Sequence, residues 1–100
     1  MLIEYTDPRG NLCRACVITK TNGLFMITYK CPGNAFDSLS DGINVDQPHE
    51  QVWYFQRPDG LYGFAIRKDG NERPILLYAR SEEEAKRIRA ELITAFSILS

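Results

Sequence analysis

A helix start at Ser81 divides this chain into two parts of different structure. Ser81 is followed three residues later by Glu84. At this spacing each side chain can accept a hydrogen bond from the other residue's backbone amide, which satisfies donors that the first turn of a helix leaves unpaired. The sequence therefore predicts a β region over residues 1–80 and one helix over residues 81–99, within a single domain of 100 residues.

Turn sequences divide the β region into about six antiparallel strands. The clearest turn is Asn22-Gly23, which supplies the two positive φ angles of a type I′ turn and predicts a hairpin between residues 12–20 and 24–31. Residues 42–45 are a candidate for an additional short strand. The other reversals contain Pro, Gly, Asp or Asn, and they predict strands at residues 2–6, 51–57, 61–68 and 73–80.

The amphipathic C-terminal helix is expected to cap the strands. Its apolar side chains fall within an arc of roughly 100°, the width of a stripe that packs on a sheet. The second hairpin carries apolar groups on both faces, so its sheet must curl or leave aromatic rings exposed. We therefore predict an α+β fold, a curled sheet or partial barrel capped by one helix. Hairpins followed by one long helix resemble, in outline, the pleckstrin-homology architecture, and this topological resemblance implies no ligand or partner.

Composition excludes several classes of protein. The chain is 44% hydrophobic and 25% charged, which is typical of a globular domain. Its net charge of −1 gives no general attraction to nucleic acid or to an anionic membrane. No apolar stretch resembles a signal peptide or a membrane span, so we expect a cytoplasmic protein. The three cysteines, with no export signal, favour reduced thiols over a disulfide framework.

The weak candidates for metal ligands are Cys13, Cys16, Cys31 and His49. The first two have the C-x2-C spacing of zinc ligands, but they lie in a strand-like run that sends residues 13 and 16 to opposite faces. Buried free thiols are the favoured interpretation. His49 has Asp46 close in sequence but no matched nucleophile, so we predict no catalytic residue and no cofactor.

Residues 32–50 form a long acidic connection that carries no Lys or Arg. Connections of this length inside compact domains are uncommon and tend to be functional or mobile. At the other end of the chain, Ile93 and Ile98 fall outside the apolar stripe of the helix. Both features indicate surfaces that a second polypeptide could cover.

The leading hypothesis is a small non-catalytic protein-binding module, of the adaptor or inhibitor type, with a homodimer as one form it could take. The predicted contact residues are Asp37, Asp41 and Asp46 in the acidic loop, Trp53, Tyr54 and Tyr62 in the second hairpin, and Ile93, Phe96 and Ile98 in the helix. The first alternative is single-stranded nucleic-acid binding by hairpin 51–67, whose aromatic rings could stack bases. The second alternative is a small zinc-binding protein.

Overall fold

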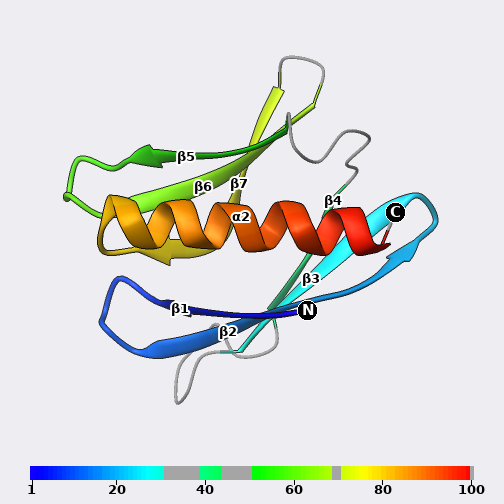
Figure 1. Cartoon of the computed structure of the whole chain (residues 1–100), viewed down its shortest axis with the longest axis horizontal. Helices are drawn as coiled ribbons and strands as arrows, with labels where there is room; N and C mark the ends of the chain where they lie inside the picture. Colours follow the sequence, from blue (N-terminus) through cyan, green and yellow to red (C-terminus); the bar gives the residue numbers. More distant parts are fainter. Residues whose placement is uncertain (31–38, 44–50, 69–70, 100) are drawn as a thin grey trace.

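The computed structural model describes residues 1–30, 39–43, 51–68 and 71–99, which form an α+β fold (Figure 1). One helix, α2, packs against two antiparallel sheets in this part of the chain. No helix in it is both long enough and apolar enough to traverse a lipid bilayer. The elements are β1 (Leu2–Thr6), β2 (Leu12–Thr21), β3 (Leu24–Lys30), β4 (Leu39–Ile43), β5 (Val52–Gln56), β6 (Tyr62–Lys68), β7 (Asn71–Ala79) and α2 (Glu82–Leu99).

Each sheet is a meander of consecutive strands. Sheet A has the order β1-β2-β3-β4, and sheet B has the order β5-β6-β7. The predicted hairpin at Asn22-Gly23 is confirmed, because these two residues have φ angles of 52° and 80° and β2 pairs antiparallel with β3. The additional strand begins earlier than predicted, at Leu39, and ends at Ile43, while residues 44 and 45 lie outside the described ranges. Over the described residues the two sheets do not join into a closed barrel.

Strand β7 connects the two sheets. Near its start, Arg73 Nη1 donates a hydrogen bond to the Gly42 carbonyl of β4. Farther along, β7 lies against β1, which forms the opposite edge of sheet A. Strand β7 therefore contacts both edge strands of sheet A, and Leu76 and Tyr78 near its end lie close to the β1–β2 turn.

The predicted N-cap of the helix is present. The Glu84 amide donates to Ser81 Oγ over 3.2 Å. The Glu84 carboxylate accepts from the Arg80 amide, at 3.4 Å, and so satisfies a donor one residue earlier than predicted. Three glutamates in the first turn, Glu82 to Glu84, place negative charge at the positive end of the helix dipole.

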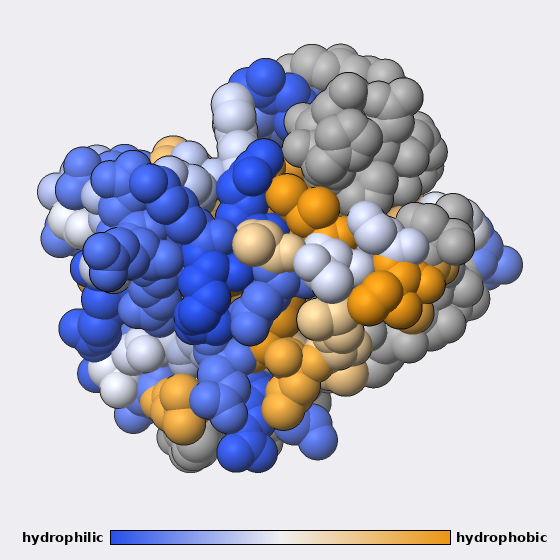
Figure 2. Space-filling model, in the orientation of Figure 1, coloured by the Kyte–Doolittle hydropathy of each residue, from blue (hydrophilic) through white to orange (hydrophobic). Residues whose placement is uncertain are grey.

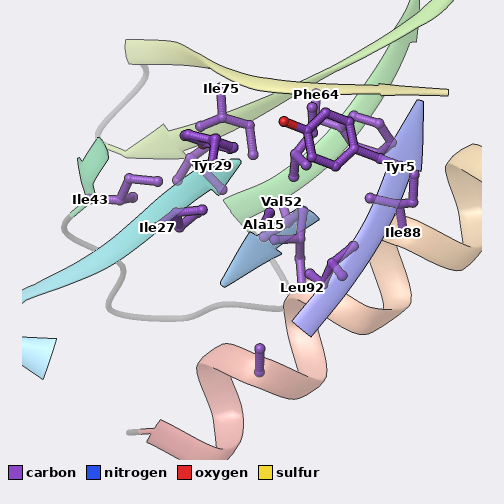
Figure 3. Packing of buried hydrophobic residues seen from close by; sticks show 14 of the residues in the cluster. Tyr5, Ala15, Ile27, Tyr29, Ile43, Val52, Phe64, Ile75, Ile88 and Leu92 are labelled. Atoms are coloured by element: carbon purple, nitrogen blue, oxygen red, sulfur yellow. The ribbon is translucent and has the colours of Figure 1, made fainter. Parts of the chain in front are cut away.

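One hydrophobic core fills the space between the two sheets and α2 (Figure 3). Every strand contributes at least one buried side chain, and α2 contributes five. The tilted rings of Phe25 and Phe96, whose centroids are 5.0 Å apart, join the end of α2 to the start of β3. The core therefore accounts for the apolar stripe of the helix and for the inner face of each sheet.

Two arginines fix the position of α2 between the sheets. Arg89 Nε donates to the Val52 carbonyl of β5 over 2.8 Å, and Arg87 Nη2 donates to the Glu4 carbonyl of β1 over 3.1 Å. The helix thus spans the gap between β5 and β1, as Figure 1 shows. Sheet B keeps its opposite face directed away from the helix.

Candidate functional site

The outer face of sheet B carries a group of aromatic and arginine side chains that contact one another. Alternation along β5 buries Val52 and sends Trp53 and Phe55 to the opposite side. Tyr78 belongs to the same face, because Phe55 and Tyr78 are both paired with Gly63. We call the set Trp53, Phe55, Arg57, Arg67 and Tyr78 the aromatic face.

Gly63 forms the floor of a groove on the aromatic face. A Cβ atom at Gly63 would lie only 2.8 Å from Phe55 Cζ, so the Phe55 ring lies directly over this glycine. The ring remains 41% exposed. The groove has a volume of about 320 Å³ and is lined by Phe55, Arg57, Gly63, Phe64, Pro74, Ile75 and Tyr78.

Arg67 covers the Trp53 ring. The guanidinium carbon lies 3.6 Å from the ring centroid, a close cation–π contact. Arg67 Nη2 also pairs with Glu72 Oε1 at 3.2 Å. The Trp53 indole nitrogen is buried and has no hydrogen-bond partner among the described residues, which is unusual for a buried donor.

Arg57 has the same relationship to Tyr78 at the other end of the face. Its guanidinium carbon lies 5.0 Å from the ring centroid, and its Nη2 pairs with Asp59 Oδ2 at 3.0 Å. Both arginines of the aromatic face therefore combine a ring contact with a carboxylate. The face presents apolar area and paired charges, with no excess of positive charge from its arginines.

Two other predicted contact residues, Tyr54 and Tyr62, lie together beside the start of α2. Their ring centroids are 6.0 Å apart in an edge-to-face arrangement, and the Tyr54 hydroxyl donates to Glu82 Oε1 over 3.2 Å. Both side chains are half-buried against the core. They support the packing of sheet B on the helix, and their role as partner contacts stays a prediction.

The three helix residues predicted to contact a partner differ in how deeply they are buried. Phe96 is fully buried against Phe25, so it cannot contact a partner from the surface, and its assignment there is corrected. Ile93 is half-buried against the core, whereas Ile98 is 67% exposed. Figure 2 shows hydrophobic surface gathered over the C-terminal half of α2, while its N-terminal half is hydrophilic.

Of the weak zinc-ligand candidates, the structure describes Cys13 and Cys16. Cys13 is fully buried and disulfide-bonded, so reduced thiols were the wrong expectation for it. Cys16 is free and half-buried. A disulfide sulfur is not a thiolate ligand. No group of three or more His, Cys, Asp or Glu side chains within the described ranges could hold a metal ion.

The acidic-loop prediction falls mostly outside the described residues. Asp37 and Asp46 lie outside them, as do the weak metal candidates Cys31 and His49. Asp41 lies on β4, opposite Ile27 of β3. The loop's part in partner binding therefore stays a prediction.

Sequence reasoning missed a buried carboxylate at the β1–β2 turn. Asp7 is 5% exposed, and its Oδ1 accepts from the amides of Arg9 and Asn11 at 2.9 and 2.8 Å. Its Oδ2 accepts from Asn11 Nδ2 at 3.2 Å. Burial by itself would raise the pKa of Asp7, but the hydrogen bonds from Asn11 and Arg9 and the nearby Arg9 charge hold that pKa below its usual value.

Sequence reasoning also missed Tyr78. Tyr78 lies on the aromatic face only because the register between β6 and β7 pairs it with Gly63, the residue that is also paired with Phe55. Asp7 did carry a signal, since a carboxylate at the first position of a Pro-Gly turn commonly accepts amides of that turn. For Tyr78 the sequence held no comparable signal.

Comparison with known proteins reveals no relative of this chain. No protein-family model matches it, and no curated protein and no solved structure matches it either. A fold class alone does not assign a function, so function has to be argued from the site.

Proposed function

We propose that this chain is a small non-catalytic protein-binding module, of the adaptor or inhibitor type, that binds its partner through the aromatic face. The observation that carries the proposal is the exposed Phe55 ring beside an open groove floored by Gly63. Trp, Tyr and Arg surround that groove, and these residue types are enriched where protein interfaces derive their binding energy. An apolar side chain of the partner would fill the groove.

The contacts of the two arginines favour a protein partner over single-stranded nucleic acid. Arg67 already covers the Trp53 ring, and Arg57 approaches the Tyr78 ring, so a stacking base would have to displace them. Both arginines are also paired with carboxylates, and a phosphate would have to compete with those pairs. The aromatic face itself contains no nucleophile with a base beside it, which supports a non-catalytic role.

A homodimer through the helix end is the second form of this proposal. The 67% exposure of Ile98 and the hydrophobic surface over the C-terminal half of α2 support it.

The finer description of the fold is also part of the proposal. We propose that the sheets form a curled arrangement that resembles the pleckstrin-homology architecture in outline, and this resemblance assigns no partner. A cytoplasmic location also stays a prediction, and the disulfide at Cys13 weighs against it, because disulfides persist mainly in oxidising compartments.

Co-purification from the source cell tests the proposal directly. Tagged wild-type chain and three variants, Phe55→Ala, Gly63→Ala and Leu12→Ala, are recovered under native conditions and their partners identified by mass spectrometry. Leu12 is the matched control, since it is 53% exposed but lies on sheet A. We expect one partner that is retained by wild type and by Leu12→Ala and lost from the two groove variants. A partner that persists in both groove variants would show that the aromatic face is not the binding surface.

Oligonucleotide titration at low salt tests the nucleic-acid alternative. Fluorescence polarisation with mixed-sequence single-stranded DNA and RNA is expected to show no binding. A salt-sensitive polarisation change that disappears in Trp53→Ala would instead assign the aromatic face to nucleic acid.

A further inference from the structure

A second site, which shares only Tyr78 with the groove, lies between the β1–β2 turn and the end of β7. It is a cavity of about 210 Å³, larger than the roughly 150 Å³ of an apolar cavity that takes up benzene. The tyrosines Tyr5, Tyr29 and Tyr78 line it, together with Leu76. Tyr5 and Tyr29 are buried, and their ring centroids are 6.4 Å apart in an edge-to-face arrangement. The cavity walls are therefore largely aromatic.

The cavity also contains one buried carboxylate. Asp7 lines this cavity. Among the described residues, Asp7 is the one polar or charged residue that is buried. The hydrogen bonds to the Asp7 carboxylate keep it ionised at neutral pH. The pKa of the Tyr5 phenol is raised by burial and by the Asp7 charge, so this tyrosine stays neutral. Three tyrosine rings and one buried carboxylate thus line a single cavity.

We propose that this cavity binds a small quaternary ammonium group, of the kind found in choline or in a trimethylated lysine side chain. Aromatic ring faces attract such cations, and the methyl groups fill an apolar cavity while spreading the charge. The Asp7 carboxylate adds attraction for a cation and disfavours an anion. Exposed Pro8 and Arg9 line the cavity at its solvent side, where a ligand would enter.

Arg9 limits the affinity of this site. Its positive charge lies near the Asp7 carboxylate at the entrance and opposes a cationic ligand. The Arg9 side chain is exposed, while its backbone amide makes the hydrogen bond to Asp7. Arg9→Ala therefore removes the opposing charge and leaves the turn intact, which supplies a variant that should bind more tightly than wild type.

The test compares choline with 3,3-dimethyl-1-butanol, which has the same shape and no charge. Each compound is titrated into the ¹⁵N-labelled chain and followed by NMR at the amides of Arg9, Gly10 and Asn11. We expect choline to shift these amides in a saturable way and to bind about fivefold or more tightly than the neutral compound. Equal binding of both compounds, or choline shifts confined to other residues, would overturn the proposal, as would the absence of choline binding.

Two variants separate the charge of the site from its shape. Asp7→Asn keeps an oxygen for the turn amides, and it is expected to weaken choline binding about fivefold while leaving the neutral compound unaffected. Arg9→Ala is expected to tighten choline binding about twofold, and it serves as the test if Asp7→Asn does not fold. An unchanged choline affinity in a folded Asp7→Asn variant, or in Arg9→Ala, contradicts the assignment. A separate titration with a trimethyllysine peptide identifies the source of the ammonium group, according to which ligand binds more tightly. Neither variant touches the groove, so this outcome is independent of the protein-binding proposal.

Discussion

Arg67 lies directly over Trp53, with its guanidinium carbon 3.6 Å from the ring centroid, as its diagonal neighbour across the β5–β6 pair. Trp53 is paired with Ala65, which puts Arg67 two residues along the same face of β6. Arg67 is in turn paired with Glu72 of β7, both in register and through a 3.2 Å ion pair. A carboxylate, a guanidinium and an indole ring thus form a ladder across all three strands of sheet B.

Replacing Arg67 should uncover the indole ring. In Arg67→Gln we expect the fluorescence emission of Trp53, the only tryptophan, to shift to longer wavelength because water reaches the ring. The free energy of unfolding should fall by about 0.5–1 kcal/mol, the usual size of an exposed cation–π contact. Glu72→Gln is the control, since it removes only an exposed ion pair and should leave the emission nearly unchanged. Equal emission spectra for Arg67→Gln and wild type would contradict the stacked arrangement.

Gly63→Ala should force the Phe55 ring out of its position. The added methyl group would lie 2.8 Å from Phe55 Cζ, and the exposed ring can move aside, so we expect a loss of about 1–2 kcal/mol of stability in urea unfolding. A Phe55→Ala background removes the clash and should reduce the cost of Gly63→Ala. Gly42→Ala is a comparison on sheet A, where the new methyl group would meet the flexible Met26 Sδ at 3.3 Å. Additive effects of Gly63→Ala and Phe55→Ala would show that the two residues do not touch.

The two described cysteines should respond differently to substitution. Cys13→Ser removes a disulfide and a buried apolar group, and we expect it to lower the free energy of unfolding by about 2–4 kcal/mol. Cys16→Ser should change it by less than about 0.5 kcal/mol, because Cys16 is free and half-buried. A reductant should lower the melting temperature of wild type and of Cys16→Ser but not of Cys13→Ser. A wild-type melting temperature that is insensitive to reductant would contradict the disulfide.

Asp7 should make stability depend on pH in the acid range. Its pKa is lower in the folded chain than in the unfolded chain, so the unfolded chain binds the proton more readily. The contribution of Asp7 is therefore complete above the pKa of the unfolded chain and is lost as the pH falls through the lower pKa of the folded chain. We expect Asp7→Asn to cost about 1–2 kcal/mol at pH 7 and progressively less below about pH 4. Urea unfolding of both proteins across this range measures the difference, and a constant difference at all pH values would contradict the assignment.

Ile98 should control self-association if the helix end is a dimer interface. We expect light scattering to give twice the chain mass for wild type and a single chain mass for Ile98→Asp, with little change in melting temperature because Ile98 is 67% exposed. Ser97→Asp adds the same charge at a neighbouring exposed position and should retain the wild-type mass. A monomeric wild-type mass at high protein concentration would remove the dimer from the proposal.

Most of the secondary structure was predictable because its signals are local. The Asn22-Gly23 turn fixes the β2–β3 hairpin through two positive φ angles, and Ser81 with Glu84 marks the start of α2. Strand β4 was only partly predicted, since its pairing with β3 depends on a partner and not on its own polar sequence. The division of the strands into two sheets was also missed, because no local pattern states where hydrogen bonding between neighbouring strands stops.

The candidate site shows the same division between local and long-range information. The aromatic pattern of the second hairpin was enough to select Trp53 as a candidate contact residue. Phe96 was selected for the same apolar character, but it is fully buried in the core. By itself the sequence determined the turns, the strand alternation and the helix stripe, since each depends on residues a few positions apart. Only the tertiary structure decided that β7 contacts both edge strands of sheet A, places Tyr78 near Phe55 and lines the tyrosine cavity together with Asp7. These contacts join residues far apart in the chain, and they depend on how the whole core packs.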